Sequence, residues 1–260
     1  MTNIKGYDLY FSYAKKEILN GIHVAIHSGK MISIVGPNGS GKSTLLKLLS
    51  GSLPLQKGEI YIDHENMRSL KPKELAKNVA ILAQNSESPA DLTVKQLVYY
   101  GRYAHQNFFN FKKSQDFHFV EWALAVTGMT EFSHHYLHEL SGGQRQRAWI
   151  AMALAQNSNC LFLDELTTYL DIRHQLEILN LLKKINHDQK KTIIMVHHDL
   201  NHAVHFSHEM IVMSAGEIKA YQAVKNILES KILNQVFNIE FKYFYNEKND
   251  PILFYENTLN

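Results

Sequence analysis

The sequence predicts an α/β fold with a mainly parallel sheet, an antiparallel β part at the N-terminus and an inserted α-helical lobe. Three observations support this prediction. The apolar run 31–35 is followed by a glycine-rich turn and then by apolar residues at helical spacing. Residues 159–165, 173–185 and 192–196 follow a strand, helix and strand pattern, which is typical of parallel sheets. Residues 85–140 have helical character without a strong strand signal.

Several shorter elements are expected before the helical lobe. Aromatic residues and a loose alternation favour a strand at the N-terminus, and Pro72 suits the first turn of a helix. The predicted strands of this part are residues 7–13, 22–26, 58–63 and 79–83, and the last of them ends at Gln84.

The length of 260 residues and the hydrophobic content of 45% predict one compact unit that carries a lobe, not two full domains. We expect a single domain over residues 1–260. Its core would comprise residues 1–84 and 156–230, its helical lobe residues 85–155 and its C-terminal tail residues 231–260.

Composition excludes several classes of protein. The formal net charge of +2 gives no reason to expect a nucleic-acid partner. The single cysteine, Cys160, argues against a disulfide framework and favours a reducing cytosol. The start of the chain has no signal-peptide pattern, and no run of about 18 uncharged apolar residues occurs. At a membrane, the protein would therefore have to dock onto other chains.

A phosphate-binding loop is predicted between the strand 31–35 and the helix that follows. The segment fits the pattern G-x-x-x-x-G-K-[ST] and consists of Gly36, Pro37, Asn38, Gly39, Ser40, Gly41, Lys42, Ser43 and Thr44. Its N–H groups and the helix N-terminus would attract an anion. Lys42 could reach the β- and γ-phosphates, and the Ser43 hydroxyl could ligate Mg²⁺. The alternative is an ordinary glycine turn.

Further polar residues stand at predicted strand ends, where parallel sheets bind ligands. Asp164 is suited to hold Mg²⁺ near Ser43, and Glu165 could orient or deprotonate an attacking water. His198 could contact a γ-phosphate, although a histidine here could also be structural. Tyr13 could stack on a nucleotide base, or be an ordinary sheet tyrosine.

A second anion-binding helix N-terminus is expected at Ser141, Gly142 and Gly143, directly before a helix over residues 148–155. Alone, this pattern would more often be a simple helix cap. Because the chain has one complete phosphate loop, the second site suggests that the γ-phosphate is held from a partner chain.

Together these motifs resemble the ATP-binding subunits of ABC transporters, over nearly the whole chain. The resemblance implies a Walker A loop at residues 36–44, an ABC signature at residues 140–144 and Mg²⁺ and ATP as cofactors. It assigns further roles to Tyr13 (base stacking), Gln84 (Q-loop, facing Mg²⁺ and the membrane partner), Ser141, Gly142, Gly143 and Gln144 (signature), Asp164 (Walker B), Glu165 (catalytic carboxylate), Asp171 (D-loop) and His198 (switch histidine).

The resemblance also implies partners. It predicts a head-to-tail homodimer that encloses two ATP molecules, each held by the Walker A loop of one copy and the signature of the other. It further predicts transmembrane permease subunits, an indirectly associated substrate-binding protein, and a peripheral location at the cytoplasmic face of the membrane.

Within the family, four stretches are similar to importers of ferric siderophores, haem and cobalamin: residues 101–106, 167–171, 174–179 and 236–254. Ferric siderophores are favoured as the commonest cargo of that group. The alternatives are haem, cobalamin or zinc import, a soluble ABC ATPase outside transport, or a nucleotide-binding regulator without hydrolysis. The 15 histidines invite a metal-binding interpretation, but they lack the cysteine or carboxylate neighbours of a strong site.

Leu166 departs from the family, which has proline after the catalytic glutamate. Proline would restrict Glu165 to extended conformations, so leucine could leave Glu165 more mobile and turnover somewhat slower. On this hypothesis Leu166→Pro raises turnover by a few-fold at most. The alternative is that Leu166 packs against apolar surface and fixes the loop equally well.

Overall fold

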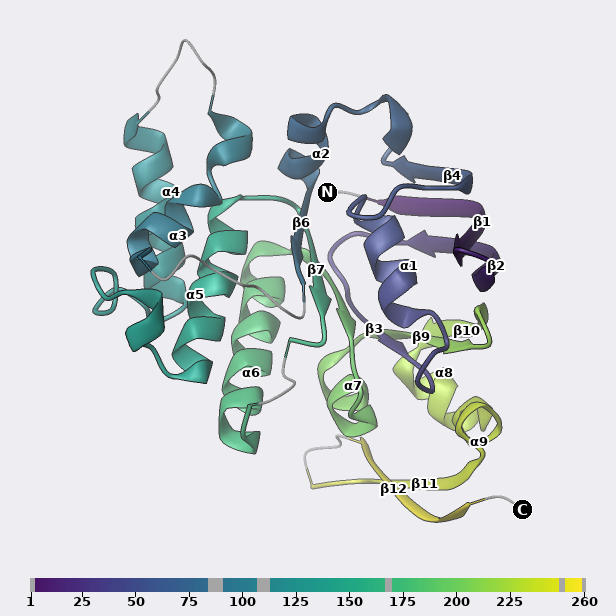
Figure 1. Cartoon of the computed structure of the whole chain (residues 1–260). Helices are drawn as coiled ribbons and strands as arrows, with labels where there is room; N and C mark the ends of the chain where they lie inside the picture. The colour runs from purple at the N-terminus through teal and green to yellow at the C-terminus, as the bar shows by residue number, and fades with distance from the viewer. Residues whose placement is uncertain (1–2, 84–90, 107–112, 167–169, 248–250, 259–260) are drawn as a thin grey trace.

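The computed structural model describes residues 3–83, 91–106, 113–166, 170–247 and 251–258 (Figure 1). The helices are α1 (Lys42–Leu49), α2 (Pro72–Asn78), α3 (Val94–Tyr100), α4 (Lys113–Val126), α5 (Gly142–Ala155), α6 (Ile172–Gln189), α7 (Leu200–Phe206), α8 (Val224–Glu229) and α9 (Ile232–Phe237). The strands are β1 (Ile4–Tyr13), β2 (Lys16–Ile26), β3 (Met31–Val35), β4 (Lys57–Ile62), β5 (Glu65–Asn66), β6 (Val79–Leu82), β7 (Cys160–Asp164), β8 (Thr192–Val196), β9 (Glu209–Ser214), β10 (Glu217–Ala223), β11 (Ile239–Tyr245) and β12 (Pro251–Thr258).

The central sheet has the strand order β10-β9-β3-β8-β7-β6. Its strands are parallel except for β10, which pairs antiparallel with β9. Every residue of β3, β7 and β8 is buried, because elements cover both faces of the sheet. The mainly parallel sheet predicted from the sequence is confirmed.

An antiparallel sheet, β2-β1-β4-β5, forms the N-terminal part. Figure 1 shows α1 between this sheet and the central sheet. The apolar core on this side joins Ile4 of β1, Leu45 of α1 and Ile34 of β3, all fully buried. Packing of α1 against both sheets fixes the loop that precedes it.

The helices α3, α4 and α5 form the inserted lobe. Their buried side chains, such as Leu97, Leu124 and Ile150, share one apolar core with α6 and the edge strands of the central sheet. The helix α5 begins at Gly142, earlier than the predicted start at residue 148. The Ser141 hydroxyl accepts a hydrogen bond from the Gln144 N–H and thereby caps the helix before the two glycines.

The C-terminal part of the chain, from α8 onward, is more structured than the sequence indicated. Helices α8 and α9 pack with α7 and β9 around a third apolar core, and β11 and β12 form a separate antiparallel hairpin. Within the described ranges, no helix is long and apolar enough to cross a lipid bilayer.

Candidate functional site

The predicted phosphate-binding loop connects β3 to α1. Gly36 has φ 155° and Gly41 has φ 98°, both in the region that favours glycine. A Cβ atom on Gly36 would lie 2.2 Å from the Met213 carbonyl oxygen, and one on Gly41 would lie 2.7 Å from Leu19. Strands β2 and β9 thus press against this loop, and only glycine fits at these two positions.

Lys42 is the first residue of α1 and is only 5% exposed. Its Nζ donates hydrogen bonds to the carbonyl oxygens of Gly36 (2.9 Å) and Pro37 (3.0 Å). Burial lowers the pKa of the Lys42 ammonium, while the nearby carboxylates Glu165 and Asp164 oppose this shift. A buried cation is therefore held by two carbonyl groups of the glycine-rich loop.

Glu165 follows β7 directly and has φ 52°, in the left-handed region. Its Oε1 lies 2.6 Å from His198 Nε2. The Glu165 side chain is 13% exposed and that of His198 is 47% exposed, so solvent can reach the pair from the histidine side. Two residues from the ends of neighbouring strands, β7 and β8, are thus joined at one point.

Asp164 ends β7 and is 2% exposed. Its Oδ2 lies 3.6 Å from the Lys47 ammonium, and its Oδ1 is buried without a hydrogen-bond partner among the described residues. A buried carboxylate oxygen without a partner is costly unless a cation or water satisfies it. Asp164 therefore fits the oxygen ligand that Mg²⁺ requires.

A cavity of about 350 Å³ brings Lys42, Glu165 and His198 together, while Asp164 and Gly36 are not part of its lining. Its lining is Tyr13, Lys16, Ile18, Asn38, Gly39, Gly41, Lys42, Ser43, Thr44, Glu165 and His198. Tyr13 is 50% exposed, and its ring packs edge-on against Phe11 with the ring centroids 4.9 Å apart. An aromatic ring, a phosphate-binding loop, a carboxylate and a histidine therefore surround one space.

The predicted signature residues are not part of this lining. Gly143 lies against the His174 ring, where a Cβ atom would come within 2.6 Å of Cδ2. His174 also contacts Asp171, which caps α6 through the His174 N–H (2.8 Å) and accepts a hydrogen bond from His174 Nδ1 (2.8 Å). These hydrogen bonds from the backbone and the ring lower the pKa of the Asp171 carboxyl.

Sequence reasoning missed the link that His174 makes between the signature and Asp171. For the contact between Asp171 and His174 the available signal was their spacing of three residues, which brings the two side chains together at the start of a helix. Lys47, which lies near Asp164, was also missed. Gln84, expected near Mg²⁺, lies outside the described residues.

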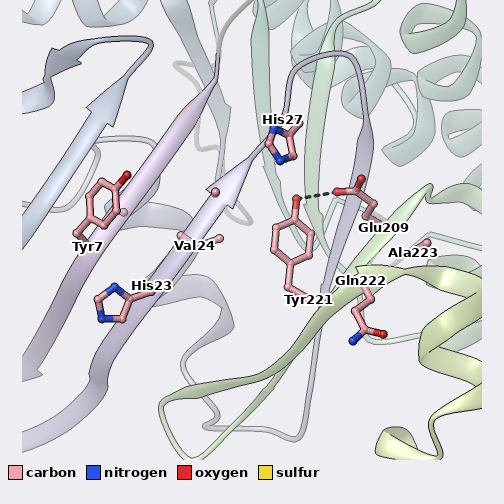
Figure 2. A pocket seen from close by; sticks show the side chains of 10 residues that line it. Tyr7, His23, Val24, His27, Glu209, Tyr221, Gln222 and Ala223 are labelled. Carbon is pink, nitrogen blue, oxygen red and sulfur yellow. Dashed lines mark hydrogen bonds between the residues drawn. The ribbon is translucent and has the colours of Figure 1, made fainter.

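A second hollow, of about 470 Å³, lies where β1 and β2 approach β9 and β10 (Figure 2). On its β9–β10 side the Tyr221 hydroxyl donates a hydrogen bond to Glu209 (2.8 Å), and burial together with this carboxylate raises the pKa of Tyr221. His23 and His27 are also part of its lining. The described residues contain no cluster of three or more metal-ligating side chains, here or elsewhere.

Comparison with known proteins identifies the family to which the chain belongs. Residues 19–168 match the ABC transporter family. The chain belongs to the ABC transporter family. It is 44% identical to the iron(3+)-hydroxamate import ATP-binding protein FhuC of Bacillus subtilis, over 92% of this chain and 89% of the relative. It is 38% identical to the ferric enterobactin transport ATP-binding protein FepC of Escherichia coli, over 92% and 88%.

Solved structures extend the likeness of this ABC protein to three dimensions. A chain of a putative metal-chelate type ABC transporter superposes with a TM-score of 0.82 at 26% identity, covering 98% of this chain and 97% of that chain. The ATP-binding cassette MJ0796, a dimer bound to ADP and Pi, superposes with a TM-score of 0.73 at 28% identity, over 85% and 98%. The resemblance stated from the sequence motifs is confirmed. The chain is a nucleotide-using ATPase of the ABC transporter family.

Proposed function

We propose that this ABC ATPase binds ATP with Mg²⁺ in the cavity around Lys42 and uses hydrolysis to power the import of ferric siderophores. The observation that carries the proposal is that Lys42, Glu165 and His198 meet at one cavity, whose other walls are the phosphate loop, Tyr13 and the start of β2. Each of these groups has a separate part in binding or cleaving a nucleoside triphosphate.

The adenine base would stack on Tyr13, and the loop N–H groups would bind the β- and γ-phosphates. Lys42 would exchange its two loop carbonyl acceptors for phosphate oxygens. Mg²⁺, held by Ser43, Asp164 and Gln84, would neutralise phosphate charge when bound.

Glu165 would accept the proton of the attacking water, and His198 would hold Glu165 and contact the γ-phosphate. Ser141, Gly142, Gly143 and Gln144 of a second copy would close the site from the other side, together with Asp171. The exposed α5 N-terminus, which is absent from the cavity lining of its own chain, supports this arrangement.

The proposed assembly is a head-to-tail homodimer bound to transmembrane permease subunits at the cytoplasmic face of the membrane, with a substrate-binding protein associated through the permease. The dimeric cassette structures support the pair. Residues 1–84 and 156–230 would form the nucleotide-binding core, residues 85–155 the lobe that transmits motion, and residues 231–260 the tail.

Ferric siderophores are the proposed cargo because several relatives carry such cargo in their names. Besides FhuC and FepC, they include the petrobactin import protein FpuC of Bacillus anthracis (39% identity).

Cargo is bound by other subunits, so the test uses cells. Deleting this chain should abolish uptake of one or more ferric siderophores, and the chain should leave the membrane fraction when its permease is deleted. Unchanged uptake of ferric siderophores of every class would contradict the cargo, and a chain found in the soluble fraction beside its permease would contradict the assembly.

Replacing Lys42 tests the site itself. Lys42→Ala removes the buried ammonium, so hydrolysis should fall by about a hundredfold or more and nucleotide binding should weaken. The measurement is phosphate release with MgATP, alongside binding of a fluorescent ATP analogue. Lys184→Ala, an exposed lysine of α6 that is not part of the cavity lining, is the matched control and should retain most of the activity. A Lys42→Ala variant that hydrolyses ATP near the wild-type rate would contradict the assignment.

A further inference from the structure

The β11–β12 hairpin carries exposed apolar side chains. Residues paired across the hairpin, such as Phe244 with Ile252 and Lys242 with Phe254, share one face. Phe244 is 51% exposed, Ile252 37% and Phe254 38%. We call Lys242, Phe244, Ile252 and Phe254 the hairpin face.

The opposite face of the hairpin packs on the protein. Leu253 is 5% exposed and belongs to the apolar core around α7. Tyr243 and Tyr245 line a hollow together with residues of α7 and α8. By contrast, Phe244 and Phe254 of the hairpin face are exposed and do not belong to this apolar core.

The hairpin is fastened to the element that follows the catalytic histidine. The Asn201 amide donates to the Leu253 carbonyl (2.9 Å) and accepts from the Leu253 N–H (2.8 Å). Asn201 lies in α7, which begins two residues after His198. Figure 1 shows the hairpin beside α7, in the lower part of the view, where the loop between β3 and α1 also turns.

We propose that the hairpin face binds a second copy of this chain and extends the contact between the two ATPases. The proposal rests on the head-to-tail pair of the proposed function. In that pair the edge that bears His198 and the phosphate loop faces the partner copy. The hairpin continues this edge, so its apolar face is placed to be covered when the pair closes.

A copy of the same chain is favoured over another occupant because of this continuity. The residues that match the family, 19–168, do not include the hairpin. The hairpin would therefore add to the pair a contact outside residues 19–168. Burial of two or three aromatic and aliphatic side chains is enough to affect the affinity of a pair.

The test measures dimerisation of the full-length chain carrying Glu165→Gln, which should bind MgATP without turnover. Phe244→Ser and Phe254→Ser are introduced separately, and Phe117→Ser on α4, 45% exposed, is the matched control. Sedimentation velocity with MgATP gives the dissociation constant of the pair. Each hairpin variant should raise it about tenfold or more, and the control should change it by less than about twofold.

Two further measurements on the same proteins separate folding and nucleotide binding from dimerisation. Thermal unfolding midpoints and monomer affinity for a fluorescent ATP analogue should match those of the parent, because the substituted side chains are exposed. If the parent pairs and the hairpin variants pair equally well, the hairpin contact is wrong while the head-to-tail pair stands. If the parent does not pair with MgATP, both are wrong. If the variants pair normally but no longer co-purify with the permease, the face binds the permease and the proposal is overturned.

Discussion

Glu165 has a left-handed backbone conformation, and its carboxylate lies 2.6 Å from the His198 ring nitrogen. This geometry limits which residue can stand at the next position, 166. A non-glycine residue at positive φ costs about 1–3 kcal/mol unless its surroundings hold it. Leu166 is 8% exposed and belongs to the core of the lobe and α6, so it anchors the turn. The structure favours the second of the two sequence-based possibilities, in which leucine fixes the loop by packing.

Leu166→Pro should therefore slow the enzyme. Proline disfavours α conformations in the preceding residue, which would move Glu165 away from φ 52° and from His198. We expect turnover to fall by about tenfold with little change in nucleotide affinity. Leu166→Met, which conserves volume, should stay near the wild-type rate. A proline variant with equal or faster turnover would support the mobile-glutamate hypothesis instead.

His197 precedes His198 in the chain but, unlike it, is buried. Its Nε2 has no hydrogen-bond partner among the described residues. Burial, reinforced by His202 and opposed by Asp199, lowers the pKa of His197 to about 4. The unfolded chain, with an ordinary histidine pKa near 6.5, therefore binds a proton more readily than the folded protein does.

This difference makes stability depend on pH. The stability that neutral His197 contributes is present above about pH 6.5 and is lost as the pH falls towards 4. His197→Leu removes the titrating group, so between pH 7.5 and 5.0 its unfolding free energy should fall by about 2 kcal/mol less than that of the wild type. Urea unfolding at the two pH values measures this. Equal losses in both proteins would contradict the assigned pKa of His197.

At the scale of elements, Arg102 fastens the end of α3 to the rest of the lobe. Its Nε donates to Asp116 of α4 (2.9 Å), and its Nη1 donates to the Ala155 carbonyl at the end of α5 (2.6 Å). The guanidinium also lies 4.3 Å from the centre of the Phe119 ring. Arg102 is 3% exposed and Asp116 6%, so this ion pair is buried.

Arg102→Leu should destabilise the protein by about 3–5 kcal/mol, because Asp116 would remain buried without its partner. The double variant Arg102→Leu with Asp116→Leu should recover much of this loss, since no unpaired charge remains. Urea unfolding of Arg102→Leu, Asp116→Leu and the double variant gives the unfolding free energies needed for a double-mutant cycle. Additive losses would show that the two side chains act independently.

The elements that the sequence predicted well are those with a local signal. The phosphate loop, β7 with its terminal Asp164 and the helical lobe depend on patterns within a few residues. The start of α5 was placed too late because glycine is a poor helix former, although the Ser141 and Gln144 capping pair was available as a signal. The β11–β12 hairpin was missed as an element because aromatic residues occupy both faces of β11, which removes the alternation that marks a strand.

At the scale of the whole molecule, the sequence could place candidate site residues at the ends of strands and helices but not show how distant elements meet. Tyr13 and His198 reach the same cavity through the order of strands in two sheets. The contact of His174 with Gly143 joins the signature to the start of α6, and no local pattern indicates it. The second copy that would complete the site is implied by the signature residues, which lie outside the cavity of their own chain.

The central claim, that two copies enclose ATP and that Glu165 is the catalytic carboxylate, is tested most directly by Glu165→Gln. Glutamine keeps the size of the side chain and leaves Asp164 in place, but it cannot accept a proton from water. Gel filtration with and without MgATP, together with phosphate release, measures both parts of the claim. We expect the variant to bind MgATP, to elute as a dimer only when MgATP is present, and to release almost no phosphate. A variant that turns over normally, or that stays monomeric when saturated with MgATP, would contradict this account.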